Sequence, residues 1–472
     1  MVSFSYKGKV EGTMVKKDFY WGTSTSAFQV EGGFGEGGKG IATTDVRHVP
    51  EGIADSKIAS DHYHHLSEDI ELMADLGIDL YRFSFNWTRV MGDGDQPNQE
   101  GIDFYNRLID GCLEKGITPF PTLYHFEMPQ ALVTKFGGWK SRKCIDYFVA
   151  YAKVCFQHFG DRVKLWGTIN EQLIVTAASD LNGNHETDAD EKMKQMYQMS
   201  YNMSLAEKKT IQVFRKIVRD GKIGPVCSMQ VVYPETPSPR NILAAKNAED
   251  FLQNCFLDMS VFGEYPKSYC NYLNEKGWYP ETEPADQEIL KKNKPDLIGI
   301  NYYCSTCIRA VEPGEDTSKL PPFYRNERFT LGNNPYLTKT KWMEFGIDPE
   351  GLYIGMRSIY EKYHLPMMVT ENGLAYSDRI EDGQIHDVYR IDYLEQHIKQ
   401  CERFMEEGYP LLGYSPWSLL DLVSSHQGFK KRYGLIFVDR TDEDPKECRR
   451  IPKDSYYWYQ NKIRNTKKGE EK

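Results

Sequence analysis

The chain of 472 residues carries 58 basic and 68 acidic side chains, a net charge of −10, and 40% of its residues are hydrophobic. That is enough apolar material to bury a large core without disulfides or metals. The acidic balance argues against nucleic acids and anionic membranes as partners, because both are bound by basic faces.

Targeting signals and metal motifs are absent from the sequence. No segment approaches the roughly 18 uninterrupted apolar residues of a membrane span, and the N-terminus lacks the apolar run of a signal peptide. We therefore expect a cytoplasmic protein. The ten cysteines are irregularly spaced, which favours reduced thiols over a disulfide framework. We expect no metal, because no second pair joins Cys304 and Cys307 to complete a zinc site.

Eight short runs rich in β-branched or aromatic residues recur along the chain and predict strands. They are residues 19–26, 80–85, 117–125, 165–171, 222–230, 296–303, 366–373 and 413–420. Segments of helical period separate them. For example, Ser141 can cap a helix that ends near Gly160. Its apolar face would comprise Ile145, Phe148, Ala152, Cys155, Phe156 and Phe159. The polar stretches 229–250 and 311–337 are predicted to be loop insertions.

The alternation of strands and helices indicates repeated βα units. No glycine-rich nucleotide fingerprint follows the first strand, and no linker interrupts the chain. We therefore predict the α/β class, a (β/α)8 TIM barrel, as one domain over 1–472 with its core at about 18–465. Its insertions and its chemistry should lie at the C-terminal ends of the strands.

Polar and aromatic residues cluster at those strand ends. Any one of them would be an ordinary loop or core residue, but together they form a ring suited to a sugar. They are Gln29, Glu31, Arg82, His125, Glu127, Asn170, Glu171, Tyr303, Glu371, Asn372 and Trp417.

Two of these residues fit the chemistry of glycosidic bond cleavage. The reaction needs one carboxyl group to protonate the leaving oxygen and a second to attack the anomeric carbon. Glu171 ends the fourth predicted strand and Glu371 the seventh, so they would face each other across the barrel mouth. Glu171 should have a raised pKa, because it must be protonated when glycosyl transfer begins.

These residues lie in stretches that resemble the successive motifs of glycoside hydrolase family 1, between Phe19 and Asp439. The stretches are FYWGTSTSAFQVEGG, YRFSFNWTRV, TLYHFEMPQAL, GTINEQ, IGINYY, VTENG and WSLLDLVSSHQGFKKRYGLIFVD. The resemblance implies a retaining β-glycosidase on a (β/α)8 barrel, without metal or cofactor. It implies Glu171 as acid/base and Glu371 as nucleophile, with Arg82 and Tyr303 beside the nucleophile. Residues matched to sugar binding are Gln29, His125, Asn170 and Trp417.

Two departures from the family pattern stand out. Gln172 replaces the Pro that usually follows the acid/base, with little expected consequence for mechanism. Ser424 and Ser425 replace a Glu and a Trp found in members that act on unphosphorylated sugars. Losing that Glu removes a charge that would repel a phosphate of about −1.5 to −2.

The stretch around Ser424 also offers groups that bind phosphate. Ser424, Lys431 and Tyr433 supply a hydroxyl, a cation and a phenol. They resemble the phosphate-binding residues of the 6-phospho-β-glycosidase branch. A basic run such as that at 430–432 is usually a solvated loop. Here the run lies close to Ser424, which stands where other family members carry a Glu.

We therefore expect a 6-phospho-β-glucosidase that releases glucose 6-phosphate from small phosphorylated disaccharides or aryl glucosides. In the family that the chain resembles, a small residue at position 425 accompanies glucoside preference and Trp accompanies galactoside preference, so Ser425 predicts the former. A 6-phospho-β-galactosidase or a dual-specificity enzyme stays open as an alternative. A catalytically inactive sugar-phosphate binding protein fits less well, because both Glu171 and Glu371 are present.

Overall fold

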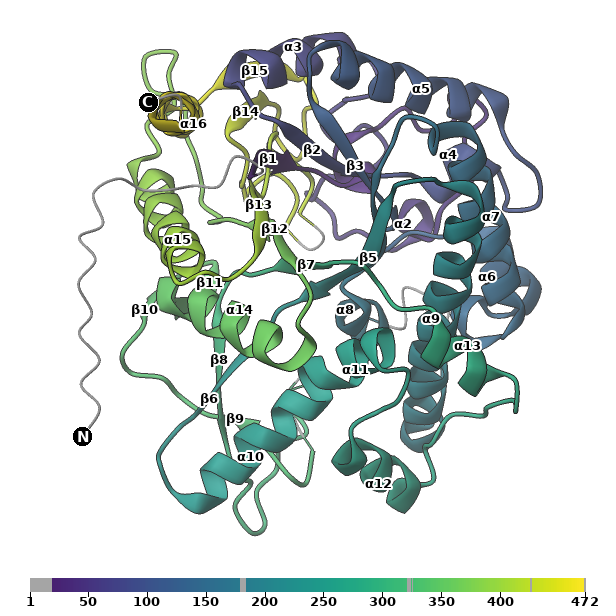
Figure 1. Ribbon diagram of the computed structural model, residues 1–472. Coiled ribbons are helices and arrows are strands. Elements are labelled where there is room, and N and C mark those ends of the chain that lie inside the picture. Colours follow the sequence, from purple (N-terminus) through teal and green to yellow (C-terminus); the bar gives the residue numbers. More distant parts are fainter. Residues whose placement is uncertain (1–18, 179–183, 321–323, 325, 425–426, 471–472) are drawn as a thin grey trace, which may run out of the picture.

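The computed structural model describes residues 19–178, 184–320, 324, 326–424 and 427–470. At its centre, eight parallel strands close into a barrel in the order β1, β13, β12, β7, β5, β4, β3, β2 (Figure 1). Seven of the predicted strands contain one barrel strand each and the eighth, 413–420, overlaps β13, so the (β/α)8 prediction is confirmed. The barrel strands are β1 (Tyr20–Ser24), β2 (Leu80–Ser84), β3 (Thr118–Tyr124), β4 (Leu165–Asn170), β5 (Lys222–Ser228), β7 (Ile298–Asn301), β12 (Met367–Asn372) and β13 (Leu411–Pro416).

Helices surround the barrel (Figure 1). The principal ones are α3 (Leu66–Leu76), α5 (Gln99–Glu114), α7 (Lys143–Phe159), α9 (Ala189–Ile217), α11 (Cys255–Val261), α13 (Asp286–Lys292), α14 (Pro349–Tyr363), α15 (Val388–Glu406) and α16 (Asp454–Glu470). Helix α7 buries the predicted face and ends at Gly160, but Arg142 rather than Ser141 is its N-cap. None of the helices within the described residues has the length and apolarity needed to cross a bilayer.

Short elements follow the C-terminal ends of the barrel strands and shape the site. The helical ones are α1 (Ala27–Val30), α2 (Thr43–Val46), α4 (Trp87–Met91), α6 (Gln130–Phe136), η1 (Gly138–Lys140), α8 (Gln172–Ala177), α10 (Pro239–Glu249), η3 (Asp250–Asn254) and α12 (Lys267–Lys276). The additional strands are β6 (Val231–Pro234), β8 (Ser305–Arg309), β9 (Thr330–Leu331), β10 (Thr338–Thr340), β11 (Met343–Ile347), β14 (Ile436–Asp439) and β15 (Arg449–Pro452).

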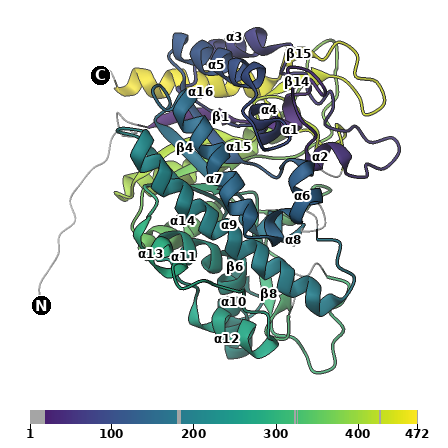
Figure 2. The same cartoon turned by 90° about the vertical axis from the view of Figure 1, so that its right-hand side faces the viewer.

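The insertion 229–250 is more ordered than predicted, and the prediction of plain loops there was wrong. It forms β6 and α10, which pack with β8 at the end of the molecule away from α3 and α5 (Figure 2). The Ser238 side chain caps α10 and Pro239 follows as its first residue. Three alanines, Ala244, Ala245 and Ala248, supply the buried face. Because alanine gives only a weak hydrophobic pattern, the polar composition concealed this helix.

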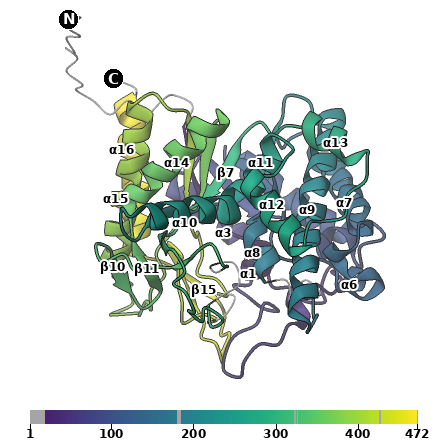
Figure 3. The same ribbon diagram turned by 90° about the horizontal axis from the view of Figure 1, so that it is seen from below.

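Two hairpins lie beside the barrel mouth. Strands β10 and β11 pair antiparallel, as do β14 and β15. Seen from below, the β10–β11 hairpin and α7 lie on opposite sides of the molecule (Figure 3).

Candidate active site

Glu371 lies near the end of β12 with both carboxylate oxygens engaged. Arg82 Nη1 donates a hydrogen bond to Oε1, and the Tyr303 hydroxyl donates one to Oε2 at 2.6 Å. The side chain is almost fully buried. A cation and a phenol therefore fix the position of this carboxylate.

Glu171 directly follows β4 and precedes helix α8. Its backbone is left-handed, with φ +45°, a strained conformation of the kind found at functional sites. Burial, reinforced by the negative charge of Glu371, raises the pKa of Glu171 to about 8. At neutral pH this carboxyl group is therefore protonated and can act as an acid.

Asn301, at the end of β7, connects that strand to the end of β4, where Asn170 and Glu171 lie. Its Nδ2 donates hydrogen bonds to Glu171 Oε1 and to Asn170 Oδ1, both at 3.0 Å. The Thr370 hydroxyl donates to its Oδ1 at 2.7 Å and so fixes the amide orientation. The sequence analysis missed Asn301, although it stands in the IGINYY stretch directly before Tyr302 and Tyr303.

The predicted sugar-binding residues form a contiguous wall. Arg82 Nη2 donates to Asn170 Oδ1 at 2.7 Å, and the Asn170 amide nitrogen lies 3.4 Å from His125 Nε2. The His125 ring stacks on Trp417, with ring centroids 5.9 Å apart. Burial and the nearby Arg82 lower the pKa of His125, so the ring is neutral. Neutral donors and acceptors thus line the space beside Glu371.

Gln29 connects this wall to the segment that contains Ser424. Gln29 Nε2 donates to the Val423 carbonyl at 3.0 Å, and the Val423 amide donates to the Gln29 carbonyl at 3.2 Å. Ser424 follows directly and is buried. Ser425 lies outside the described residues.

The basic triplet at 430–432 contains three different environments. Lys430 is exposed and lies 3.9 Å from Asp442, whereas Arg432 is buried and paired with Asp421 at 2.7 Å. Among the described residues, Lys431 alone of the three forms no ion pair, although the Glu344 carboxylate attracts it from a greater distance. Its ammonium group lies over the rings of Tyr433 at 5.5 Å and Trp342 at 5.8 Å, and burial lowers its pKa.

Tyr433 connects the Lys431 cation to the surroundings of Glu371. Its ring meets Tyr303 edge to face at 6.3 Å. Both tyrosines pack on a small apolar cluster of Val30, Trp417 and Leu422. Trp342, in the β10–β11 turn, was not predicted from the sequence, because an isolated Trp between loop residues carries no periodic signal.

Two strand-end carboxylates do not join the site. Glu31 accepts from Arg89 at 3.0 Å and from Tyr105 at 2.6 Å, inside the protein. Glu127 accepts from Asn86, and burial raises its pKa. Both are committed to other side chains.

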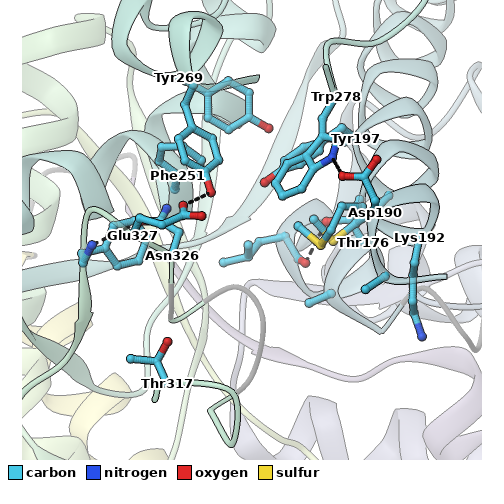
Figure 4. A pocket seen from close by; sticks show the side chains of 18 of the residues that line it. Thr176, Asp190, Lys192, Tyr197, Phe251, Tyr269, Trp278, Thr317, Asn326 and Glu327 are labelled. Atoms are coloured by element: carbon cyan, nitrogen blue, oxygen red, sulfur yellow. Dashed lines mark hydrogen bonds between the residues drawn. The ribbon is translucent and has the colours of Figure 1, made fainter. Parts of the chain in front are cut away.

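Gln172 has a structural role in place of the family's usual Pro. Its amide donates to the Ser200 carbonyl at 2.6 Å and so fastens α8 to α9. A cavity of about 590 Å³ adjoins α8 and includes Tyr197, Phe251, Tyr269 and Trp278 in its wall (Figure 4). Neither Glu171 nor Glu371 lines it, so the cavity is separate from the paired carboxylates.

Comparisons with known proteins relate the chain to one family and to solved structures of similar fold. A model of Glycosyl hydrolase family 1 matches residues 12–468. The aryl-phospho-beta-D-glucosidase BglC of Bacillus subtilis is 40% identical, with 95% of this chain and 97% of that protein covered. Beta-glucosidase A of Thermotoga maritima is 37% identical, with 95% and 97% covered. A crystallised family 1 β-glucosidase from Thermotoga maritima superposes with a TM-score of 0.86, at 35% identity and with 97% and 99% covered.

Proposed function

Because the chain belongs to glycosyl hydrolase family 1 and is therefore a glycoside hydrolase, we propose that it hydrolyses 6-phospho-β-D-glucosides with retention of configuration. The relative named as an aryl-phospho-beta-D-glucosidase is 40% identical to this chain. The relative named simply as a beta-glucosidase is 37% identical, which is nearly the same. Overall identity therefore does not separate the two substrate classes, and the residues around the sugar must do so.

In the first step, Glu371 attacks the anomeric carbon while Glu171 protonates the leaving oxygen. The contacts from Arg82 and Tyr303 support this division, since they hold the Glu371 carboxylate in one orientation for attack. A Glu171 pKa of about 8 keeps the acid protonated at neutral pH.

In the second step, water releases the sugar and Glu171 acts as base. Forming the ester neutralises Glu371, whose negative charge is one of the two causes that raise the Glu171 pKa. The pKa of Glu171 therefore falls after the first step, as a residue that changes from acid to base requires. Together the two steps require the two carboxyl groups and one molecule of water, which enters in the second step.

The single observation that carries the substrate assignment is Lys431, which forms no ion pair within the described residues and lies next to Tyr433. Burial disfavours this cation, and the attraction of Glu344 offsets only part of that effect, so a ligand anion would compensate the rest. A 6-phosphate on the sugar supplies that anion, with Ser424 and Tyr433 offering hydrogen bonds. The wall formed by Gln29, His125, Asn170 and Trp417 would hold the sugar itself.

The unpaired thiols support a cytoplasmic location for this reaction. All ten cysteines are free, and most are buried. Reduced thiols persist in a reducing compartment.

The test is hydrolysis of three matched nitrophenyl substrates: β-glucoside, 6-phospho-β-glucoside and 6-phospho-β-galactoside. We expect the highest kcat/KM for the 6-phosphoglucoside. A preference for the unphosphorylated glucoside would overturn the proposal, and a preference for the galactoside would assign the enzyme to the 6-phospho-β-galactosidases. Binding without turnover of any of the three would indicate an inactive sugar-phosphate binding protein.

A further inference from the structure

A cavity of about 520 Å³ lies between the β10–β11 hairpin and the segment that follows β12. Three cations line it, Lys339, Lys341 and Arg379, with Glu381 as the single carboxylate in its wall. We call it the basic cleft. In a chain of net charge −10, a concave surface with this local excess of positive charge attracts anions against the overall field.

The cations of the basic cleft are available to a ligand. Within the described ranges, none of the three forms an ion pair. Lys339 donates to the Asn333 side chain at 3.0 Å, and Lys341 lies over the Trp342 ring at 4.3 Å. Surface lysines elsewhere do find carboxylates, as Lys399 does with Glu395 at 3.2 Å.

Aromatic rings form part of the same wall. Tyr376 and Tyr389 stack with ring centroids 3.8 Å apart, and Tyr376 is 40% exposed. The Tyr389 hydroxyl donates to buried Asp378 at 2.6 Å, which holds the pair in place. Rings that are already ordered cost little entropy on binding and offer an apolar face for the carbons of a sugar ring.

The basic cleft adjoins the residues proposed to bind the substrate phosphate. Trp342 belongs to its wall and also lies beside Lys431. Tyr376 and Arg432 exchange two backbone hydrogen bonds of 2.9 Å. The Glu171 and Glu371 carboxylates do not line it.

We propose that the basic cleft is a second binding site for a phosphorylated sugar, outside the catalytic centre. The cations would bind the phosphate, and the tyrosine pair would contact the sugar. The phosphorylated nature of the ligand follows from the cations, while the choice of a sugar rests on the proposed function.

The test uses isothermal titration of the full chain with glucose 6-phosphate and, in a separate arm, with inorganic phosphate. The variants are Lys341→Ala combined with Arg379→Ala, and the charge reversal Arg379→Glu. A matched control, Lys153→Ala combined with Lys291→Ala, removes two exposed cations on α7 and α13, across the molecule from the β10–β11 hairpin (Figure 3).

We expect two binding events per chain for the wild type and the control. Both cleft variants should weaken one of them by about tenfold to a hundredfold, because each lost charge-assisted contact contributes on that scale. Glucose 6-phosphate should bind more tightly than inorganic phosphate, and kcat should not change. Cleft variants that titrate like the control would overturn the proposal. Equal affinity of the basic cleft for glucose 6-phosphate and for inorganic phosphate would overturn it as well.

The same titration separates this inference from the proposed function. Lys431→Ala should weaken the other binding event by about tenfold to a hundredfold and leave binding at the basic cleft unchanged. If the enzyme prefers unphosphorylated glucosides but the cleft variants still weaken one binding event, only the proposed function fails. If the enzyme prefers 6-phosphoglucosides while the cleft variants bind normally, only the cleft proposal fails.

Discussion

The ring of Tyr303, whose hydroxyl donates to Glu371, meets the ring of Tyr433 edge to face at 6.3 Å. One tyrosine thus orients the proposed nucleophile, and the other lies under the free ammonium of Lys431. This contact couples the place where the bond breaks to the place where the phosphate is proposed to bind. A substrate anchored at Lys431 would have its anomeric carbon positioned relative to Glu371.

The roles of the two carboxylates can be separated with azide. In Glu171→Ala the nucleophile stays, so azide should replace the attacking water and give a glycosyl azide of retained configuration. In Glu371→Ala azide should attack the free face and give the inverted product. Products identified by NMR in the reverse order would require the two assignments to be exchanged.

The pH profile should reflect the raised pKa of Glu171. Because this acid must be protonated, kcat/KM for substrates with poor leaving groups should fall as pH rises through about 8. Glu371→Gln removes a charge that raises this pKa, so the Glu171 pKa should fall in that variant, as NMR titration of the carboxyl carbon would measure. An unchanged pKa in Glu371→Gln would show that the two groups do not interact.

A buried ionic network holds the segment that carries Lys431. Asp421 accepts from Arg432 and from Lys453, each at 2.7 Å. Asp421→Ala leaves the buried Arg432 without its carboxylate, while Lys453 keeps its pair with Asp378, so the free energy of unfolding in urea should fall by about 3–5 kcal/mol. As a control, Glu395→Ala removes an exposed pair with Lys399 and should cost under about 1 kcal/mol. Equal effects would mean that the network contributes no more than a surface ion pair.

The sequence alone predicted the barrel, because eight short runs rich in β-branched or aromatic residues alternate with segments of helical period. It also predicted the residues that meet around Glu371, since the ends of parallel strands share one face. Three features could not be predicted. The alanine face of α10 gave a weak signal, and Asn301 acts through hydrogen bonds between strands. In the triplet 430–432, only the folded structure shows which of the three cations forms no ion pair within the described residues.

Preference between gluco and galacto epimers is the prediction that rests on sequence alone, because Ser425 lies outside the described residues. The family resemblance implies that Trp at this position meets an axial 4-hydroxyl. Ser425→Trp should shift the ratio of kcat/KM values toward the 6-phosphogalactoside by about an order of magnitude. A wild-type enzyme that already prefers the galacto epimer would contradict the assignment.

The most direct test of the proposed phosphate recognition compares two neighbouring lysines. Lys431→Ala should lower the ratio of kcat/KM for 6-phosphoglucoside over glucoside by about tenfold to a hundredfold, since a charge-assisted contact contributes about 1.5–3 kcal/mol. Ser424→Glu should lower it further by placing like charges together. Lys430→Ala, which removes an exposed lysine 3.9 Å from Asp442, should leave the ratio unchanged. Equal losses on both substrates in Lys431→Ala, or equal effects of the two lysine variants, would show that Lys431 does not bind the phosphate.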